Sequence, residues 1–156
     1  ASLSAVAYHF ARELRDSLRV PVGIIVNAVG GAPTEAWIDR ASLEEELPGL
    51  LRRWRSNDFI MPWVRQRASE NVKLKDSPLT RHPYAPHYLF DTGIRPLEHY
   101  ALRGVLWYQG ESNAHNIEVH ERLFPQELAQ LLRCAAALLL RAAQLDQPPL
   151  LAALPR

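Results

Sequence analysis

The stretch VGIIVNAV, residues 22–29, is a continuous apolar run that is rich in β-branched side chains. A run of this kind is typical of a strand that other elements cover on both faces. Before it, apolar side chains recur at every fourth position over residues 4–19, which predicts an amphipathic helix with Ser4 as its N-cap. A helix that leads directly into a buried strand predicts an α/β fold.

Two more apolar segments extend this prediction to a parallel sheet. GVLWY, residues 104–108, has the composition of a second buried strand. PPLLAALP, residues 148–155, is short and apolar enough for a third. We therefore expect one domain over residues 1–156, with helices alternating with the strands.

The helices are expected between these strands. Helical patterns occupy two pieces between residues 39 and 71, and a third region over residues 117–145 is interrupted near Pro125. Ser42 with Glu45 forms a capping-box pattern at the start of the first piece. Asp58 is the expected cap of the second piece.

Length, charge and residue use exclude several classes of protein. The chain has 156 residues, 47% of them apolar, and a formal net charge of +1 without a basic cluster, which argues against a nucleic-acid partner. No apolar run reaches the ~18 residues of a membrane span. Cys134 is the single cysteine, so an intrachain disulfide is impossible. The chain starts without Met and already in a helical pattern, as expected of a mature or excised chain.

The histidines do not follow a metal-binding pattern. His115 and His120 lie five residues apart, whereas a helical zinc pair is spaced i, i+4. His82 and His87 lie in a long Pro-rich loop. We expect neither a metal nor another cofactor.

Both of the first two predicted strands end in a polar turn that contains glycine, NAVGGAPTE at residues 27–35 and WYQGESNAH at residues 107–115. In a parallel sheet the two turns would meet at one edge, where α/β proteins bind ligands. A glycine backbone N–H that converges with the amide of a Gln or Asn suits an oxyanion hole, because a tetrahedral oxyanion needs preorganised donors. Two unrelated polar turns in an ordinary α/β protein would give the same pattern.

The residues around these turns resemble a known family. GIIVNAVGGAPTEAWID and LRGVLWYQGESNA are similar to two blocks of the sialate O-acetylesterases and related carbohydrate acetylesterases of the SGNH hydrolase superfamily. HYLFDTGIRPL and the opening SAVAYHFARELRDSLRVPVG are also similar to that family. The resemblance covers roughly residues 4–125, and the blocks stand in the family's order.

The resemblance implies a fold and a reaction. The fold would be a flavodoxin-like three-layer α/β/α sandwich with a parallel sheet, incomplete in this chain. The reaction would be hydrolysis of an acetyl ester on a sugar hydroxyl, through an acyl-enzyme on serine and without a cofactor. The substrate would be an O-acetylated sugar or sialic acid, and the family's usual location would be secreted or periplasmic.

The resemblance also implies roles for residues of this sequence. Gly30 or Gly31 would give a backbone donor to the oxyanion hole, and Gln109 a side-chain donor. Glu111 and Asn113 would brace the second turn. The family's Gly-Gln-Ser-Asn-Met nucleophile motif and its Asp-x-x-His block are absent from this sequence.

Two assignments remain open at this point. Glu35 would either order the glycine turn or contact substrate. Ser112, within Gly-Glu-Ser-Asn-Ala, half-imitates a nucleophile elbow, although the family gives this serine no attacking role and a turn hydroxyl is the expected reading.

The sequence supports two functions for the chain. In the first, it is the central segment of a carbohydrate O-acetylesterase and is inactive by itself, because an oxyanion hole without nucleophile and base retains little catalysis. In the second, it is a noncatalytic, truncated family member that serves as a sugar-binding or assembly segment. Such a chain would self-associate or bind the missing segments of the same protein.

Overall fold

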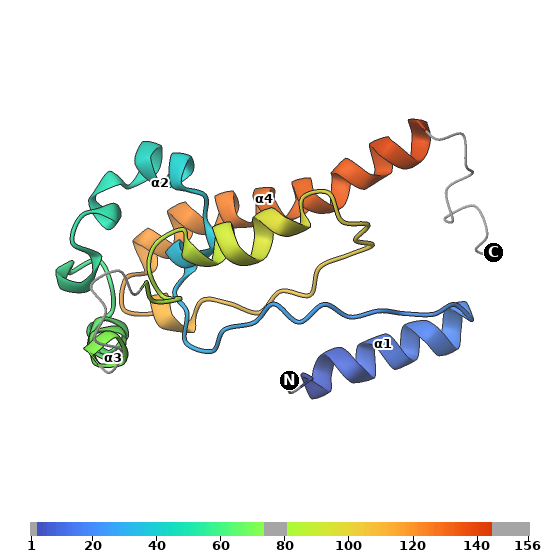
Figure 1. Ribbon diagram of the computed structural model, residues 1–156, viewed down its shortest axis with the longest axis horizontal. Coiled ribbons are helices and arrows are strands. Elements are labelled where there is room, and N and C mark those ends of the chain that lie inside the picture. The colour runs from blue at the N-terminus through green and yellow to red at the C-terminus, as the bar shows by residue number, and fades with distance from the viewer. Residues whose placement is uncertain (1–2, 74–80, 145–156) are drawn as a thin grey trace. The chain divides into compact units, whose positions relative to one another are not determined.

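The computed structural model describes residues 3–73 and 81–144, the part from residue 132 onward as backbone only (Figure 1). The chain divides into two compact units, Ala1–Gly30 and Gly31–Arg156.

The first unit is one helix followed by an extended segment. Helix α1 spans Ala5–Leu18, and Ser4 caps it by accepting a hydrogen bond from the Ala7 backbone N–H at 3.4 Å. It ends at Arg19, which adopts a left-handed conformation with φ 56°. The predicted helix and its cap are both confirmed.

The predicted parallel α/β/α sandwich is wrong for the described residues, which contain no strand or sheet. Residues 22–29 and 104–108 are irregular and unpaired, and no arrow appears on the coloured ribbon in Figure 1. Their apolar side chains remain accessible, with Ile25 46% and Tyr108 90% exposed. A strand needs a hydrogen-bonded neighbour, and an apolar β-branched run does not supply one. The third predicted strand, residues 148–155, lies outside the described residues.

The second unit consists of short helices around α4, Ile117–Gln144. Helix α4 continues through Pro125, so the predicted interruption there is wrong. The other elements, in chain order, are η1 Thr34–Trp37, α2 Arg40–Glu46, η2 Pro48–Leu51, η3 Trp54–Ser56, α3 Pro62–Lys73, the π-helical η4 Phe90–Ile94, η5 Arg95–Leu97 and η6 Glu111–Asn113.

Asp39 replaces one of the predicted caps, and the other predicted cap, Asp58, pairs with an arginine. Asp39, rather than Ser42, caps α2, because its Oδ1 accepts the Ser42 backbone N–H at 2.9 Å. Ser42 is thus the third residue of the helix and donates its hydroxyl to Asp39 Oδ2 at 2.7 Å. Asp58 lies before α3 and pairs with Arg65 at 3.3 Å instead of capping the helix.

The core of the second unit lies between η1, α2, α3 and α4. Trp37 is buried and packs edge-on against Trp107, with ring centroids 5.7 Å apart. The largest fully buried aliphatic side chains are Ile38, Leu43, Leu50, Ile60, Val64 and Leu123. None of the helices in the described ranges is both long and apolar enough to cross a bilayer.

The unpaired state of the two apolar segments is testable by hydrogen exchange. We expect backbone amides of residues 22–29 and 104–108 to exchange much faster than amides of α4 up to Leu131, because only the helical amides are hydrogen-bonded within their element. The measurement is residue-resolved exchange of the purified chain. Protection of either segment equal to that of α4 would contradict the described fold.

Candidate functional site

The first turn of the site depends on a glycine. Gly31 has φ 77°, and a Cβ at this position would lie 2.7 Å from the Trp63 ring and 2.8 Å from the Tyr84 hydroxyl oxygen. No side chain fits there without moving two aromatic residues. Gly30 ends the first unit, and a Cβ there would meet nothing within 4 Å.

The second turn also depends on a glycine. Gly110 has φ 132°, and a Cβ on it would lie 3.1 Å from Nε2 of His120. The short helix η6 follows at once and is closed by a bond from the Asn113 backbone N–H to the Gly110 carbonyl at 2.9 Å. The backbone at residue 110 is therefore held close to the His120 ring of α4.

Side-chain hydrogen bonds join the two turns, which we call the turn cluster, residues 31–35 and 109–113. Gln109 Nε2 donates to the Ala32 carbonyl at 2.7 Å. Ser112 Oγ donates to the Gly31 carbonyl at 3.0 Å. The sequence predicted that a sheet edge would bring these turns together, whereas the described structure joins them by side chains.

Asn113 makes the central contact of the turn cluster. Its Oδ1 accepts the Thr34 backbone N–H at 2.8 Å, and its Nδ2 donates to Glu35 Oε2 at 2.9 Å. Both Asn113 and Glu35 are buried. Glu111, in contrast, has an exposed side chain at the start of η6.

The Glu35 carboxyl group is enclosed, with 1% of the residue exposed. Burial raises its pKa, and the hydrogen bond from Asn113 acts in the opposite direction. Its backbone carbonyl also accepts the His87 N–H at 2.9 Å. These contacts are those of a residue that orders the turn.

A second buried carboxyl group lies on α4, and the sequence analysis missed it. Glu127 is completely buried, and neither carboxylate oxygen has a hydrogen-bond partner among the described residues. Burial raises its pKa to about 9, and the negative charge of Glu35 contributes to the rise. The signal in the sequence was a glutamate on the helix face of Leu123 and Leu131, where apolar residues are expected.

Two neighbours of Glu127 on α4 also contact the chain around η1. His120 Nδ1 lies 3.0 Å from Thr34 Oγ1. Gln130 binds Asp39, through its Oε1 to the Asp39 backbone N–H at 3.2 Å and through its amide nitrogen to the Asp39 carboxylate. In the described ranges no group of three or more His, Cys, Asp or Glu side chains is arranged to hold a metal ion.

The raised pKa of Glu127 predicts a pH-dependent stability. The folded chain keeps this proton up to about pH 9, whereas the unfolded chain loses it near the ordinary pKa of 4.5. The Glu127 contribution to stability is therefore fully present below pH 4.5 and is lost as pH rises toward 9.

Glu127→Gln should reduce the fall of stability with pH and make the chain more stable than wild type at pH 8, while the buried Glu35 still contributes a fall of the same sign. The measurement is the urea-derived free energy of unfolding at pH 5 and pH 8. Glu118→Gln, an exposed change on the same helix, is the matched control and should leave the slope in place. An unchanged slope in Glu127→Gln would contradict the burial of an ionisable, unpartnered carboxyl.

Comparison with known proteins identifies relatives of the chain. Sialate O-acetylesterase of Rattus norvegicus is 31% identical over 138 residues, which cover 81% of this chain and 25% of the rat protein. The protein of the same name from Mus musculus is 32% identical over 130 residues, covering 80% and 24%. That of Homo sapiens is 33% identical over 124 residues, covering 79% and 20%.

The match covers most of this chain but only a small part of each relative. The chain spans a quarter or less of the length of these curated relatives. No protein-family model matches it, and no solved structure matches it. The resemblance predicted from the two turn blocks is confirmed, and the chain belongs to the sialate O-acetylesterase-like family, of which it matches a partial segment.

Proposed function

We propose that the turn cluster supplies the oxyanion-binding part of a sialate O-acetylesterase reaction, in which an acetyl ester on a sugar hydroxyl is hydrolysed through a serine acyl-enzyme. The relatives that support this proposal carry the name sialate O-acetylesterase. The nucleophile and the general base would come from sequence other than these 156 residues. The substrate would be an O-acetylated sugar or sialic acid.

The observation that carries the proposal is the fixed position of the Gln109 amide. A primary amide has two N–H donors, and the Ala32 carbonyl takes one of them at 2.7 Å. That bond orients the amide, so the second N–H is directed before any ligand arrives. A preorganised neutral donor is what a developing oxyanion requires. Gly30 or Gly31 would give the second donor through its backbone N–H.

The other residues of the turn cluster would hold the oxyanion donors in position. Asn113 holds Thr34 and Glu35, and Gly31 and Gly110 each have a positive φ that a residue with a side chain rarely adopts. Rigid support matters because an oxyanion donor displaced by a fraction of an ångström loses much of its effect. Glu35 is enclosed, which favours the ordering role over contact with substrate.

Ser112 has the contacts of a turn hydroxyl. It is 5% exposed, and its hydroxyl proton is directed to the Gly31 carbonyl at 3.0 Å. An attacking serine instead needs its proton directed to a general base. This contact supports a chain that stabilises the oxyanion and does not attack, and that is inactive on acetyl esters by itself.

A second candidate function is a noncatalytic assembly segment. The observation that favours it is the exposed apolar run of Val105, Leu106 and Tyr108, which directly precedes Gln109. Contiguous exposed apolar side chains mark surfaces that bind other protein segments. The two functions differ in whether Gln109 affects turnover or only association.

Replacement of a segment in an active relative tests the esterase proposal. In Rattus norvegicus sialate O-acetylesterase the matching segment would be exchanged for that of this chain, and the chimera assayed on an O-acetylated sialic acid. We expect an active chimera whose kcat falls ~100- to 1000-fold on Gln109→Ala, with little change in KM, because the lost contact forms mainly in the transition state.

Gln66→Ala is the matched control, since Gln66 is an exposed glutamine on α3 and should leave kcat unchanged. A folded chimera without activity, or one whose kcat is insensitive to Gln109→Ala, would contradict the proposal. In the second case an association defect of Gln109→Ala would favour the assembly segment.

A further inference from the structure

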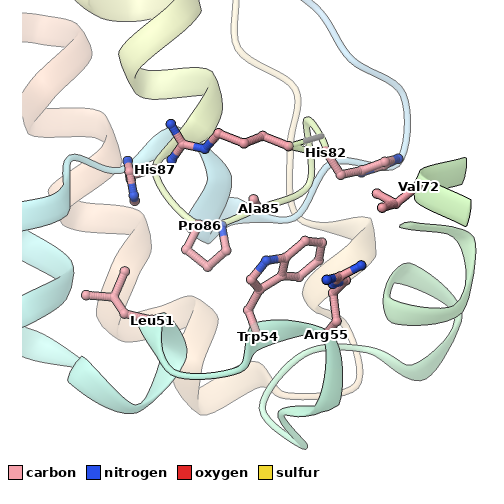
Figure 2. A pocket seen from close by; sticks show the side chains of 9 residues that line it. Leu51, Trp54, Arg55, Val72, His82, Ala85, Pro86 and His87 are labelled. Atoms are coloured by element: carbon pink, nitrogen blue, oxygen red, sulfur yellow. The ribbon is translucent and has the colours of Figure 1, made fainter. Parts of the chain in front are cut away.

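The histidines of the second unit differ in what their rings contact. His82 and His87 line a cavity of about 240 Å³ (Figure 2). Nε2 of His82 lies 3.0 Å from Nδ2 of Asn71. Nδ1 of His87 lies 2.7 Å from Oδ2 of Asp91, so both of these rings are bound to residues outside the turn cluster. The ring of His120, in contrast, lies against the turn cluster itself.

The first contact of the His120 ring is with the turn that contains Gly31. Nδ1 of His120 lies 3.0 Å from the Thr34 hydroxyl oxygen. Because Thr34 is fully buried, its hydroxyl needs a partner within the protein, and the imidazole supplies one. Asn113 binds the backbone N–H of the same threonine at 2.8 Å. Thr34 is therefore held by Asn113 from the second turn and by His120 from α4.

The second contact of the His120 ring is with Gly110, the residue directly after Gln109. A Cβ on Gly110 would lie 3.1 Å from Nε2 of His120 and 3.3 Å from its Cε1. The edge of the imidazole thus occupies the space that a side chain would need at this position. The Phe124 ring, with its centroid 5.4 Å from that of His120, limits rotation of the imidazole. One side chain outside the turn cluster therefore contacts both of its turns.

The two contacts lie on either side of the bond that orients the Gln109 amide. Gln109 Nε2 donates to the Ala32 carbonyl at 2.7 Å, and Ala32 is two residues before Thr34. Gly110 follows Gln109 in the chain. Since such a bond weakens once its atoms separate beyond ~3.2 Å, a small shift of one turn against the other would release the amide. A residue that contacts both turns, as His120 does, opposes this shift.

We propose that His120 is a positioning residue of the esterase site and acts through Gln109. Its contacts with Thr34 and Gly110 keep the Gln109 amide on the Ala32 carbonyl, so that the second N–H stays directed for an oxyanion. The catalytic consequence rests on the proposed function, whereas the effect on the Gln109 amide follows from the contacts themselves. In this role His120 transfers no proton and does not touch the substrate.

Substitutions of His120 in the chimera test the catalytic consequence. His120→Phe keeps an aromatic ring but has no polar atom at the place of Nδ1, and we expect kcat to fall ~10-fold with little change in KM. His120→Asn has a side-chain amide atom at the place of Nδ1 and should recover most of this loss. His99→Phe, the same change at an exposed histidine, is the matched control and should leave kcat unchanged.

A double variant with Gln109→Ala separates positioning from a general effect on the fold. If His120 acts through Gln109, His120→Phe should lower kcat little further once the Gln109 amide is absent. A ~10-fold loss on top of that of Gln109→Ala would place the action of His120 elsewhere and would overturn the inference. Unchanged kcat in His120→Phe, or a His120→Asn chimera no better than His120→Phe, would overturn it as well.

The side-chain N–H resonances of Gln109 in the isolated chain give a readout that needs no activity, with Gln109→Ala as their assignment. In the wild type and in His120→Asn we expect them displaced from their positions in the denatured chain, and in His120→Phe moved toward those positions. Resonances that His120→Phe leaves unchanged would contradict the inference. An inactive chimera with the expected resonances would remove the proposed function and leave the hold of His120 on Gln109 in place, so the two failures are distinguishable.

Discussion

The buried side chain of Asn113 is the contact on which the rest of the site depends. It joins two turns that are 79 residues apart in the sequence, by accepting the Thr34 backbone N–H and donating to the Glu35 carboxylate. Both bonds are shielded from water, so the loss of this amide would leave the buried Thr34 N–H without its acceptor and would remove a donor from the buried Glu35 carboxyl group. Such a loss costs several kcal/mol when a charged group is involved. Gln109, four residues before Asn113, makes its own bond to the same first turn, at the Ala32 carbonyl.

Two carboxyl groups are buried in the same region, and their burial lowers the stability of the fold when they ionise. Glu35 and Glu127 are both enclosed, burial raises the pKa of each, and the negative charge of Glu35 raises the pKa of Glu127 further. On either side of Glu127, α4 contacts the segment around η1, through His120 with Thr34 and Gln130 with Asp39. These contacts hold the first turn against α4.

Local patterns predicted the helices well and the larger architecture poorly. Ser4 and the fourfold apolar spacing defined α1, because a helix satisfies its own hydrogen bonds within one segment. Residues 22–29 and 104–108 were predicted as strands from composition, but a strand depends on a neighbour that composition does not reveal. Asp39 was missed as the cap of α2 because Ser42 offered an equally good pattern three residues later. Glu127 was missed because its burial arises from tertiary packing and carries no local motif.

The central claim is that the turn cluster stabilises an oxyanion and does not attack the ester. A fluorophosphonate probe tests it most directly on the purified chain, with intact mass, peptide mapping and Ser112→Ala as the control. We expect no labelling above that of the denatured chain, because the Ser112 hydroxyl is bound to the Gly31 carbonyl. Stoichiometric labelling at Ser112 that is lost in Ser112→Ala would contradict it and would make this turn the source of the nucleophile.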